Sequence, residues 1–110
     1  MSYFVHVTSA ADQDLAEAFD YIDLALKNPI AADFLVDTAA KKLAQLSTFP
    51  KRCPFVRDPF LAAIGIRFLP VQSYLAFYRI DEADETVHIL RFLYGQSNWA
   101  SILKTDLLPN

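Results

Sequence analysis

Five arginines are the residues of this sequence whose type and position most need a chemical explanation. They are Arg52, Arg57, Arg67, Arg79 and Arg91. Arg67, Arg79 and Arg91 interrupt apolar segments, where a guanidinium needs a carboxylate, a phosphate or an aromatic ring as its partner. Two explanations stay open. Either these arginines pair within their own chain, for example with Asp58 or an aromatic face, or Arg67 and Arg91 offer donors on an open sheet face to an acidic partner or a phosphate.

Tyrosine, histidine and cysteine are the other side chains that could do chemistry. Tyr78 or Tyr94 beside the arginines could help a proton transfer if its pKa were lowered, but a phenol with a pKa near ~10 is a poor base. His6, His88 and Cys53 are far apart in the sequence and lack paired ligand spacing, so structural roles are expected and no metal site. No phosphate-binding loop or hydrolase motif is present, and no cofactor is expected.

The 110 residues suit one domain spanning residues 1–110. The net charge of −3 disfavours a tight, sequence-independent grip on nucleic acid. The charge is uneven, because residues 1–50 hold seven acids against three lysines and residues 51–80 hold five cations against one acid. The N-terminus does not read as a signal peptide, no apolar run suits a membrane span, and the single cysteine fits a reducing compartment. A cytoplasmic protein without a membrane partner is therefore expected.

Hydrophobic periodicity predicts an α+β fold in the order β-α-α-β-β-β with a short C-terminal helix. The expected elements are a strand at Tyr3–Val7, helices near 10–27 and 30–48, strands near 65–71, 74–80 and 86–94, and a terminal helix with Trp99, Ile102 and Leu103 on one face. Asn28-Pro29 separates the two long helices, because the residue before proline avoids the helical region and proline suits a first helical position. The helices should form a hairpin packed on an antiparallel sheet.

The lengths of the turns predict which strand residues face one another. A two-residue turn at Gln72-Ser73 places Arg67 opposite Tyr78, and a four-residue loop at 82–85 places Ala76 opposite Arg91. Arg67, Tyr78 and Arg91 would then share one sheet face. The opposite face, expected to pack on the helical hairpin, would carry Ile66, Phe68, Leu75, Phe77, Leu90 and Phe92, together with Arg79 opposite His88.

Several local strings, taken in their order, resemble the RelE/ParE superfamily of bacterial type II toxin–antitoxin toxins. They are FVHVTSAADQDLAEAFDYI, NPIAADFL, LAQLSTFPKRCPFVRD, GIRFLPVQSYLAFYRID and VHILRFLYGQSNWASIL. The resemblance covers nearly the whole chain. It implies a small toxin that a cognate antitoxin protein holds inactive in a toxin–antitoxin hetero-oligomer.

The resemblance also implies which residues meet a partner. The expected partner-binding residues are Arg52, Arg57, Arg67, Tyr78, Arg91 and Trp99. Acidic antitoxin side chains would suit the arginines. For Trp99 two interpretations stay open, since its helical stripe either docks the antitoxin or covers the core.

Members of this superfamily either block DNA gyrase or cut messenger RNA in the ribosome. RNA-cutting members tend to have basic residues at positions that here read Arg67, Tyr74 and Gln96-Ser97, of which only the first is basic. Tyr94-Gly95 looks more like the gyrase-directed group, although that group usually has arginine after the glycine. ParE-type action on gyrase is therefore favoured. The alternatives are a ribosome-dependent endonuclease with Arg67, Arg91 and Tyr94 as catalytic residues, and an inactive toxin-fold binding module.

Overall fold

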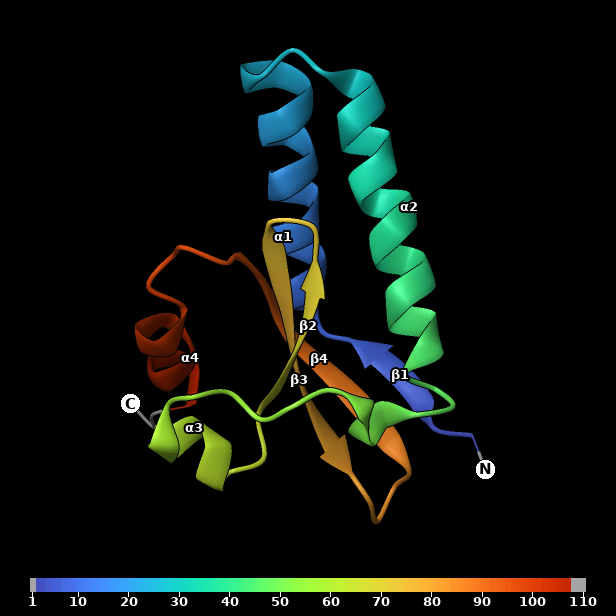
Figure 1. Cartoon of the computed structure of the whole chain (residues 1–110), viewed down its shortest axis with the longest axis vertical. Coiled ribbons are helices and arrows are strands. Elements are labelled where there is room, and N and C mark those ends of the chain that lie inside the picture. The colour runs from blue at the N-terminus through green and yellow to red at the C-terminus, as the bar shows by residue number, and fades with distance from the viewer. Residues whose placement is uncertain (1, 108–110) are drawn as a thin grey trace.

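A four-stranded sheet lies between a long helical hairpin and two short helices (Figure 1). This computed structural model describes residues 2–107. Its elements are β1 (Phe4–Val7), α1 (Ser9–Asp20), a π-helical turn (Tyr21–Ala25), α2 (Pro29–Gln45), a 3-10 turn (Pro50–Arg52), α3 (Pro59–Ala63), β2 (Arg67–Val71), β3 (Tyr74–Asp81), β4 (Thr86–Tyr94) and α4 (Trp99–Leu107). The predicted fold class and order are confirmed, while α3 and the two short turns were not predicted.

The sheet has the strand order β1-β4-β3-β2 and is mixed. β2, β3 and β4 form the predicted antiparallel meander, but β1 runs parallel to β4. The expectation of a purely antiparallel sheet is therefore wrong at this edge. The physical reason is the helical hairpin that follows β1, because a connection of that length carries the chain back across the sheet and permits a parallel pair.

The helical hairpin is built as its residues predict. Thr8 caps α1 by accepting a hydrogen bond from the Ala11 N–H, and Asn28 caps α2 in the same way with the Ala31 N–H. Pro29 occupies the first turn of α2, where its missing N–H costs nothing. The first helix loses its α-helical register at the π-helical turn, which ends at Ala25, and Lys27 beyond it has a left-handed φ of 53°.

Both faces of the sheet are covered, and the hairpin covers the face that the sequence did not indicate. Under α1 and α2 lie Ala76, Tyr78, Val87, Ile89 and Phe92. Phe92 was predicted for this face and lies there, but the other five apolar residues of that set pack with Leu61 of α3 and with Trp99 and Leu103 of α4; they are Ile66, Phe68, Leu75, Phe77 and Leu90. This assignment was wrong because Arg67 and Tyr78 marked their face as polar, yet the segment around Pro50 covers both side chains.

A β-bulge in β4 corrects the predicted register. Arg67 lies opposite Tyr78, as expected, but Arg91 lies opposite Phe77 and not Ala76. The register shifts between Phe77 and Tyr78, where Leu90 is the extra residue. Since side chains alternate between faces along a strand, one inserted residue moves Arg91 to the face opposite that of Tyr78 and Arg67.

Candidate partner-binding surface

Arg91 joins α1, β4 and α4. Its Nε lies 2.7 Å from Asp14 Oδ2 and its Nη2 lies 2.9 Å from Asp14 Oδ1, while Nη1 lies 3.0 Å from Asp106 Oδ2. The side chains of Arg91 and Asp14 are 21% and 9% exposed. The hydrogen bonds to Asp14 are the main cause of a raised Arg91 pKa, so the guanidinium stays charged. The guanidinium of Arg91 is therefore already paired with two carboxylates of its own chain.

Arg67 is held by the segment that follows the hairpin. Its Nη1 donates to the Cys53 carbonyl at 2.6 Å and to the Lys51 carbonyl at 3.3 Å. Its guanidinium carbon lies 4.0 Å from the centroid of the Phe55 ring, which is a cation–π contact. Of the two explanations for the strand arginines, pairing within the chain holds for both Arg67 and Arg91, and they do not share an open sheet face.

Tyr78 has no surface to offer to a partner in this conformation. Its side chain is completely buried, and its hydroxyl donates a hydrogen bond of 2.6 Å to the Pro50 carbonyl. Burial is the main cause that raises the pKa of Tyr78, so the phenol remains a neutral donor. The expectation that Tyr78 binds a partner fails for the isolated chain, because the 3-10 turn covers the ring.

Two of the other predicted residues meet in one hollow. Arg57 and Trp99 line a shallow cavity of about 290 Å³ together with Phe68 and Leu75. The Trp99 ring is half-buried, with its centroid 5.0 Å from that of Phe77. This contact makes Trp99 part of the core between the sheet and helices α3 and α4, whereas Arg57 is exposed beside it. Arg52 is exposed on the 3-10 turn, so Arg52 and Arg57 remain accessible cations.

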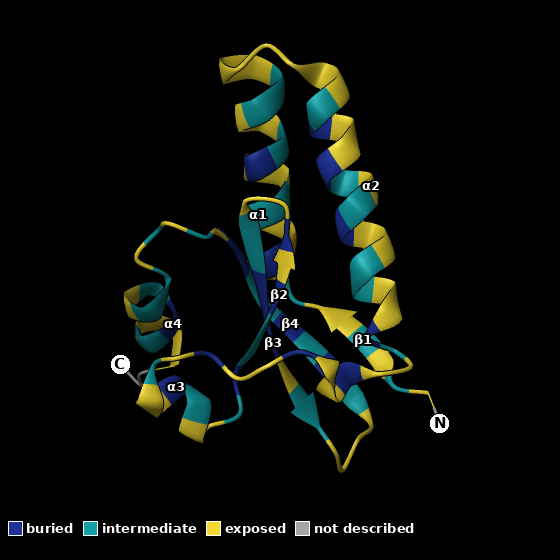
Figure 2. Cartoon of the chain, viewed as in Figure 1, coloured by how far each residue is buried: buried dark blue, intermediate teal, exposed yellow. Residues whose placement is uncertain are grey.

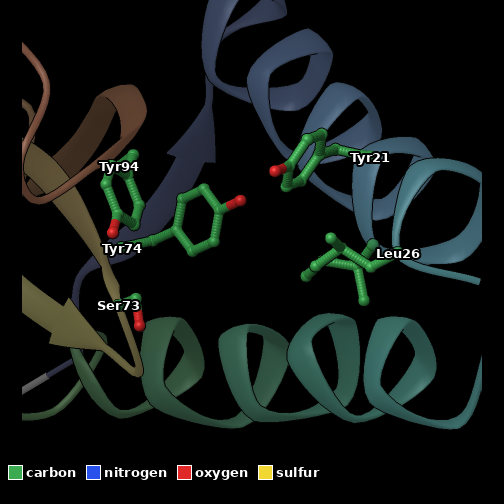
Figure 3. Close-up of a pocket in the computed structure, with 6 residues that line it drawn as sticks. Tyr21, Leu26, Ser73, Tyr74 and Tyr94 are labelled. Carbon is green, nitrogen blue, oxygen red and sulfur yellow. The ribbon is translucent and has the colours of Figure 1, made fainter. Parts of the chain in front are cut away.

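A groove lies between the helical hairpin and the end of the sheet. Its volume is about 580 Å³, and it is lined mainly by apolar surface. We call it the tyrosine groove; its residues are Tyr21, Ile22, Leu26, Ser73, Tyr74 and Tyr94. Figure 3 shows Tyr21 and Leu26 on the hairpin side facing Tyr74 and Tyr94 on the sheet side.

Aromatic contacts fix the sheet side of the groove. Tyr74 stacks on Phe92 with ring centroids 5.2 Å apart and an interplanar angle of 7°, and it meets Tyr94 edge-on at 5.7 Å. Tyr74 and Tyr94 are also direct cross-strand neighbours. Partial burial is the main cause that raises the pKa of Tyr74. This wall is therefore built of aromatic rings that pack on one another.

The free end of the hairpin, which Figure 2 colours mostly as exposed, carries further large apolar side chains. Tyr21, Leu24, Leu26, Ile30 and Phe34 are between 56% and 81% exposed. A run of five large apolar side chains in water is unusual for a monomer and typical of a protein–protein contact surface. Tyr94, predicted as a catalytic candidate, belongs to this surface and contacts neither Arg67 nor Arg91 through a side-chain hydrogen bond.

Sequence reasoning missed the hairpin side of this groove. Leu15, Phe19, Ile22 and Leu26 have the sequence spacing that is typical of one continuous core-facing stripe on a helix. The π-helical turn ends that regular spacing, and Leu26 is exposed. Asn28-Pro29 marked the end of the helix, but nothing local signalled the change of helix type before it.

The comparisons with known proteins agree with this architecture. A family model for the ParE toxin of the type II toxin–antitoxin system parDE matches residues 5–99. The chain belongs to this ParE toxin family. No curated protein sequence matches it.

Solved structures place this ParE-family chain among both ParE and RelE folds. The chromosomal ParDE system from P. aeruginosa matches with a TM-score of 0.65 and 20% identity, over 84% of this chain and 96% of that one. The RelBE2 toxin–antitoxin complex from Mycobacterium tuberculosis matches with a TM-score of 0.58 and 27% identity, over 86% and 99%. A double arginine-to-alanine mutant of E. coli toxin RelE in the free state gives 0.62 and 16%, over 98% and 100%.

Potential metal ligands do not cluster in threes within the described residues. Within residues 2–107, no group of three or more histidine, cysteine, aspartate or glutamate side chains is placed to hold an ion. Within the same residues no helix is both long and apolar enough to span a bilayer. The arrangement is that of a small toxin fold with an apolar groove and with Arg52 and Arg57 exposed outside it.

Proposed function

We propose that this chain is the growth-inhibiting toxin of a type II toxin–antitoxin pair and that it acts by binding DNA gyrase. Its cognate antitoxin neutralises it. Gyrase and the ribosome are both cytoplasmic, so the proposal includes a cytoplasmic location. The match to the ParE family over residues 5–99 carries the proposal.

The state of the strand arginines supports gyrase binding over RNA cleavage. Cleavage needs cations aimed at a phosphorane and a base for the 2′-hydroxyl proton. Arg91 is occupied by Asp14 and Asp106, and Arg67 donates to two backbone carbonyls. Freeing Arg91 would leave Asp14, only 9% exposed, without its charge partner, at a cost of about 3–5 kcal/mol. A mechanism by surface contact needs no such rearrangement.

We place the antitoxin on the tyrosine groove and the adjoining apolar surface of the hairpin. The groove has an apolar lining with tyrosine hydroxyls, which suits the apolar side of a helix or strand. The occupant follows from the family, because two structural neighbours are named as the ParDE system and the RelBE2 toxin–antitoxin complex. Arg52 and Arg57 lie outside the groove and can meet acidic antitoxin residues that extend past it.

Expression of the chain alone in a bacterium tests its target. Growth, plasmid supercoiling and transcript integrity are measured in the same cultures, and purified gyrase is assayed for supercoiling with and without the chain. Growth arrest with lost supercoiling and intact transcripts is expected. Transcripts cut within codons would instead identify the chain as a ribosome-dependent endonuclease. Normal growth would identify it as an inactive binding module, and either result overturns the gyrase proposal.

A pair of matched substitutions tests the antitoxin surface. Leu26→Glu places a carboxylate in the groove, whereas Phe60→Glu places one at a residue of similar exposure on α3, across the sheet. The probe is the protein encoded by the open reading frame next to the toxin gene. Leu26→Glu should weaken its binding at least about tenfold, which is about 1.4 kcal/mol, and Phe60→Glu should not. If the two variants bind the antitoxin with equal affinity, the proposal that the antitoxin occupies the groove is wrong.

A further inference from the structure

His6 and His88 are separated by 82 positions, but the parallel pairing of β1 with β4 makes them direct neighbours. Their Nδ1 atoms lie 3.1 Å apart, and the rings meet edge-on with an interplanar angle of 87°. Sequence spacing alone therefore did not reveal this contact. The toxin activity proposed above makes no use of this pair.

We propose that His6 and His88 form a two-histidine site for a late first-row divalent cation, with zinc as the reference ion. Two nitrogens that each bind a tetrahedral zinc at about 2.0–2.1 Å are about 3.4 Å apart. The observed separation of 3.1 Å is close to that value. Imidazole nitrogen suits zinc, copper and nickel, and water completes the coordination shell.

The pair lies on the sheet face that is turned away from the core under the helical hairpin. Val5, Val87 and Ile89 face the core under the helical hairpin. His6 and His88 alternate with them along the strands and therefore lie on the other sheet face. His6 is exposed and His88 is half-buried, so His6 can turn without disturbing the core. Because the two ligands belong to different strands, a bound ion would fasten the four-residue strand β1 to β4.

Arg79 is the neighbouring charge that opposes a cation. It lies directly opposite His88 on β3 and is exposed. The strand order puts it on the far side of His88 from His6. Asp81, two residues further along β3, is an acid on the same face. Replacing Arg79 with glutamine removes the repulsion and should therefore tighten metal binding without supplying a new imidazole.

Zinc titration of the untagged chain tests the site, since His6 and His88 are its only histidines. Calorimetry should show one zinc per chain, and zinc should raise the melting temperature because it binds the folded state. His6→Gln and His88→Gln should each abolish both effects. Cys53→Ser is the matched control: it removes the buried thiol as a zinc ligand and should leave binding unchanged.

Several outcomes separate a metal site from a simple hydrogen-bonded pair. Tighter binding by Arg79→Gln would support the site, and circular dichroism of each variant establishes that it is folded. Absence of zinc binding by the folded wild-type chain would overturn the proposal, as would full binding by either folded histidine variant. Loss of binding in Cys53→Ser alone would also overturn it, because the thiol would then be the ligand.

Discussion

Replacing Arg91 with alanine should destabilise the fold strongly. Arg91 is 21% exposed and holds both oxygens of Asp14, which is 9% exposed. After the substitution, Asp14 keeps the hydrogen bond from the Phe92 N–H at 3.0 Å but loses its charge partner. Removing one member of a buried pair costs about 3–5 kcal/mol, and the partial exposure of Arg91 places the expectation near the lower end, about 3 kcal/mol.

Urea and thermal unfolding measure this loss. For a domain of this size, about 3 kcal/mol corresponds to a fall in melting temperature of about 10–20 °C. Asp14→Ala should cost a similar amount, and a double-mutant cycle should give a coupling energy of about 2–3 kcal/mol. Asp106→Ala is the control, since this second partner is 41% exposed and its loss should cost less than about 1 kcal/mol.

The reasoning fails if the two single substitutions are additive in the double mutant or if each costs less than about 0.5 kcal/mol. A more instructive failure would be an Arg91→Ala chain that keeps its stability and loses toxicity. Arg91 would then serve the target and not the fold, which would favour the endonuclease alternative.

Other substitutions probe the remaining contacts. Tyr78→Phe should cost about 1–3 kcal/mol in urea unfolding, because the Pro50 carbonyl loses its 2.6 Å donor inside the core; an unchanged midpoint would contradict this. Trp99→Ala should cost about 3 kcal/mol and leave antitoxin affinity nearly unchanged; weaker binding at unchanged stability would instead make Trp99 a docking residue. The hydrogen bond with Lys104, followed by that from the Leu61 N–H, holds the pKa of Asp58 below its usual range. The folded-state pKa is lower than the unfolded-state pKa. The ionised carboxylate therefore stabilises the fold at a pH above the unfolded-state pKa, and this stabilisation is lost as the pH falls through the folded-state pKa. Asp58→Asn should therefore lower the melting temperature at neutral pH and converge with the wild type in acid, and parallel curves would refute the pairing.

The local parts of the fold could be predicted because short-range physics sets them. The helical hairpin followed from residue spacing and from Asn28-Pro29, and the β2–β3 register followed from the two-residue turn at Gln72-Ser73. Gln72 itself adopts a left-handed φ of 56°, as such a turn requires. These features depend on neighbours within a few residues.

The candidate site was much less predictable. The arginines were recognised as needing partners, but the partner of Arg91 is Asp14 on a distant helix, one of many acids available in the first half of the chain. The tyrosine groove combines a π-helical turn with the end of the meander, and no local pattern joins these two segments.

The sequence alone determined the order of the elements, the family resemblance and the need for partners at Arg67 and Arg91. Only the tertiary structure decided that the hairpin covers the face of Tyr78, that both arginines are occupied, and that His6 meets His88. The physical reason is that side chains alternate along a strand with a period of two. One extra residue at Leu90 therefore changes the face of everything beyond it, and contacts across the sheet depend on how the whole chain packs.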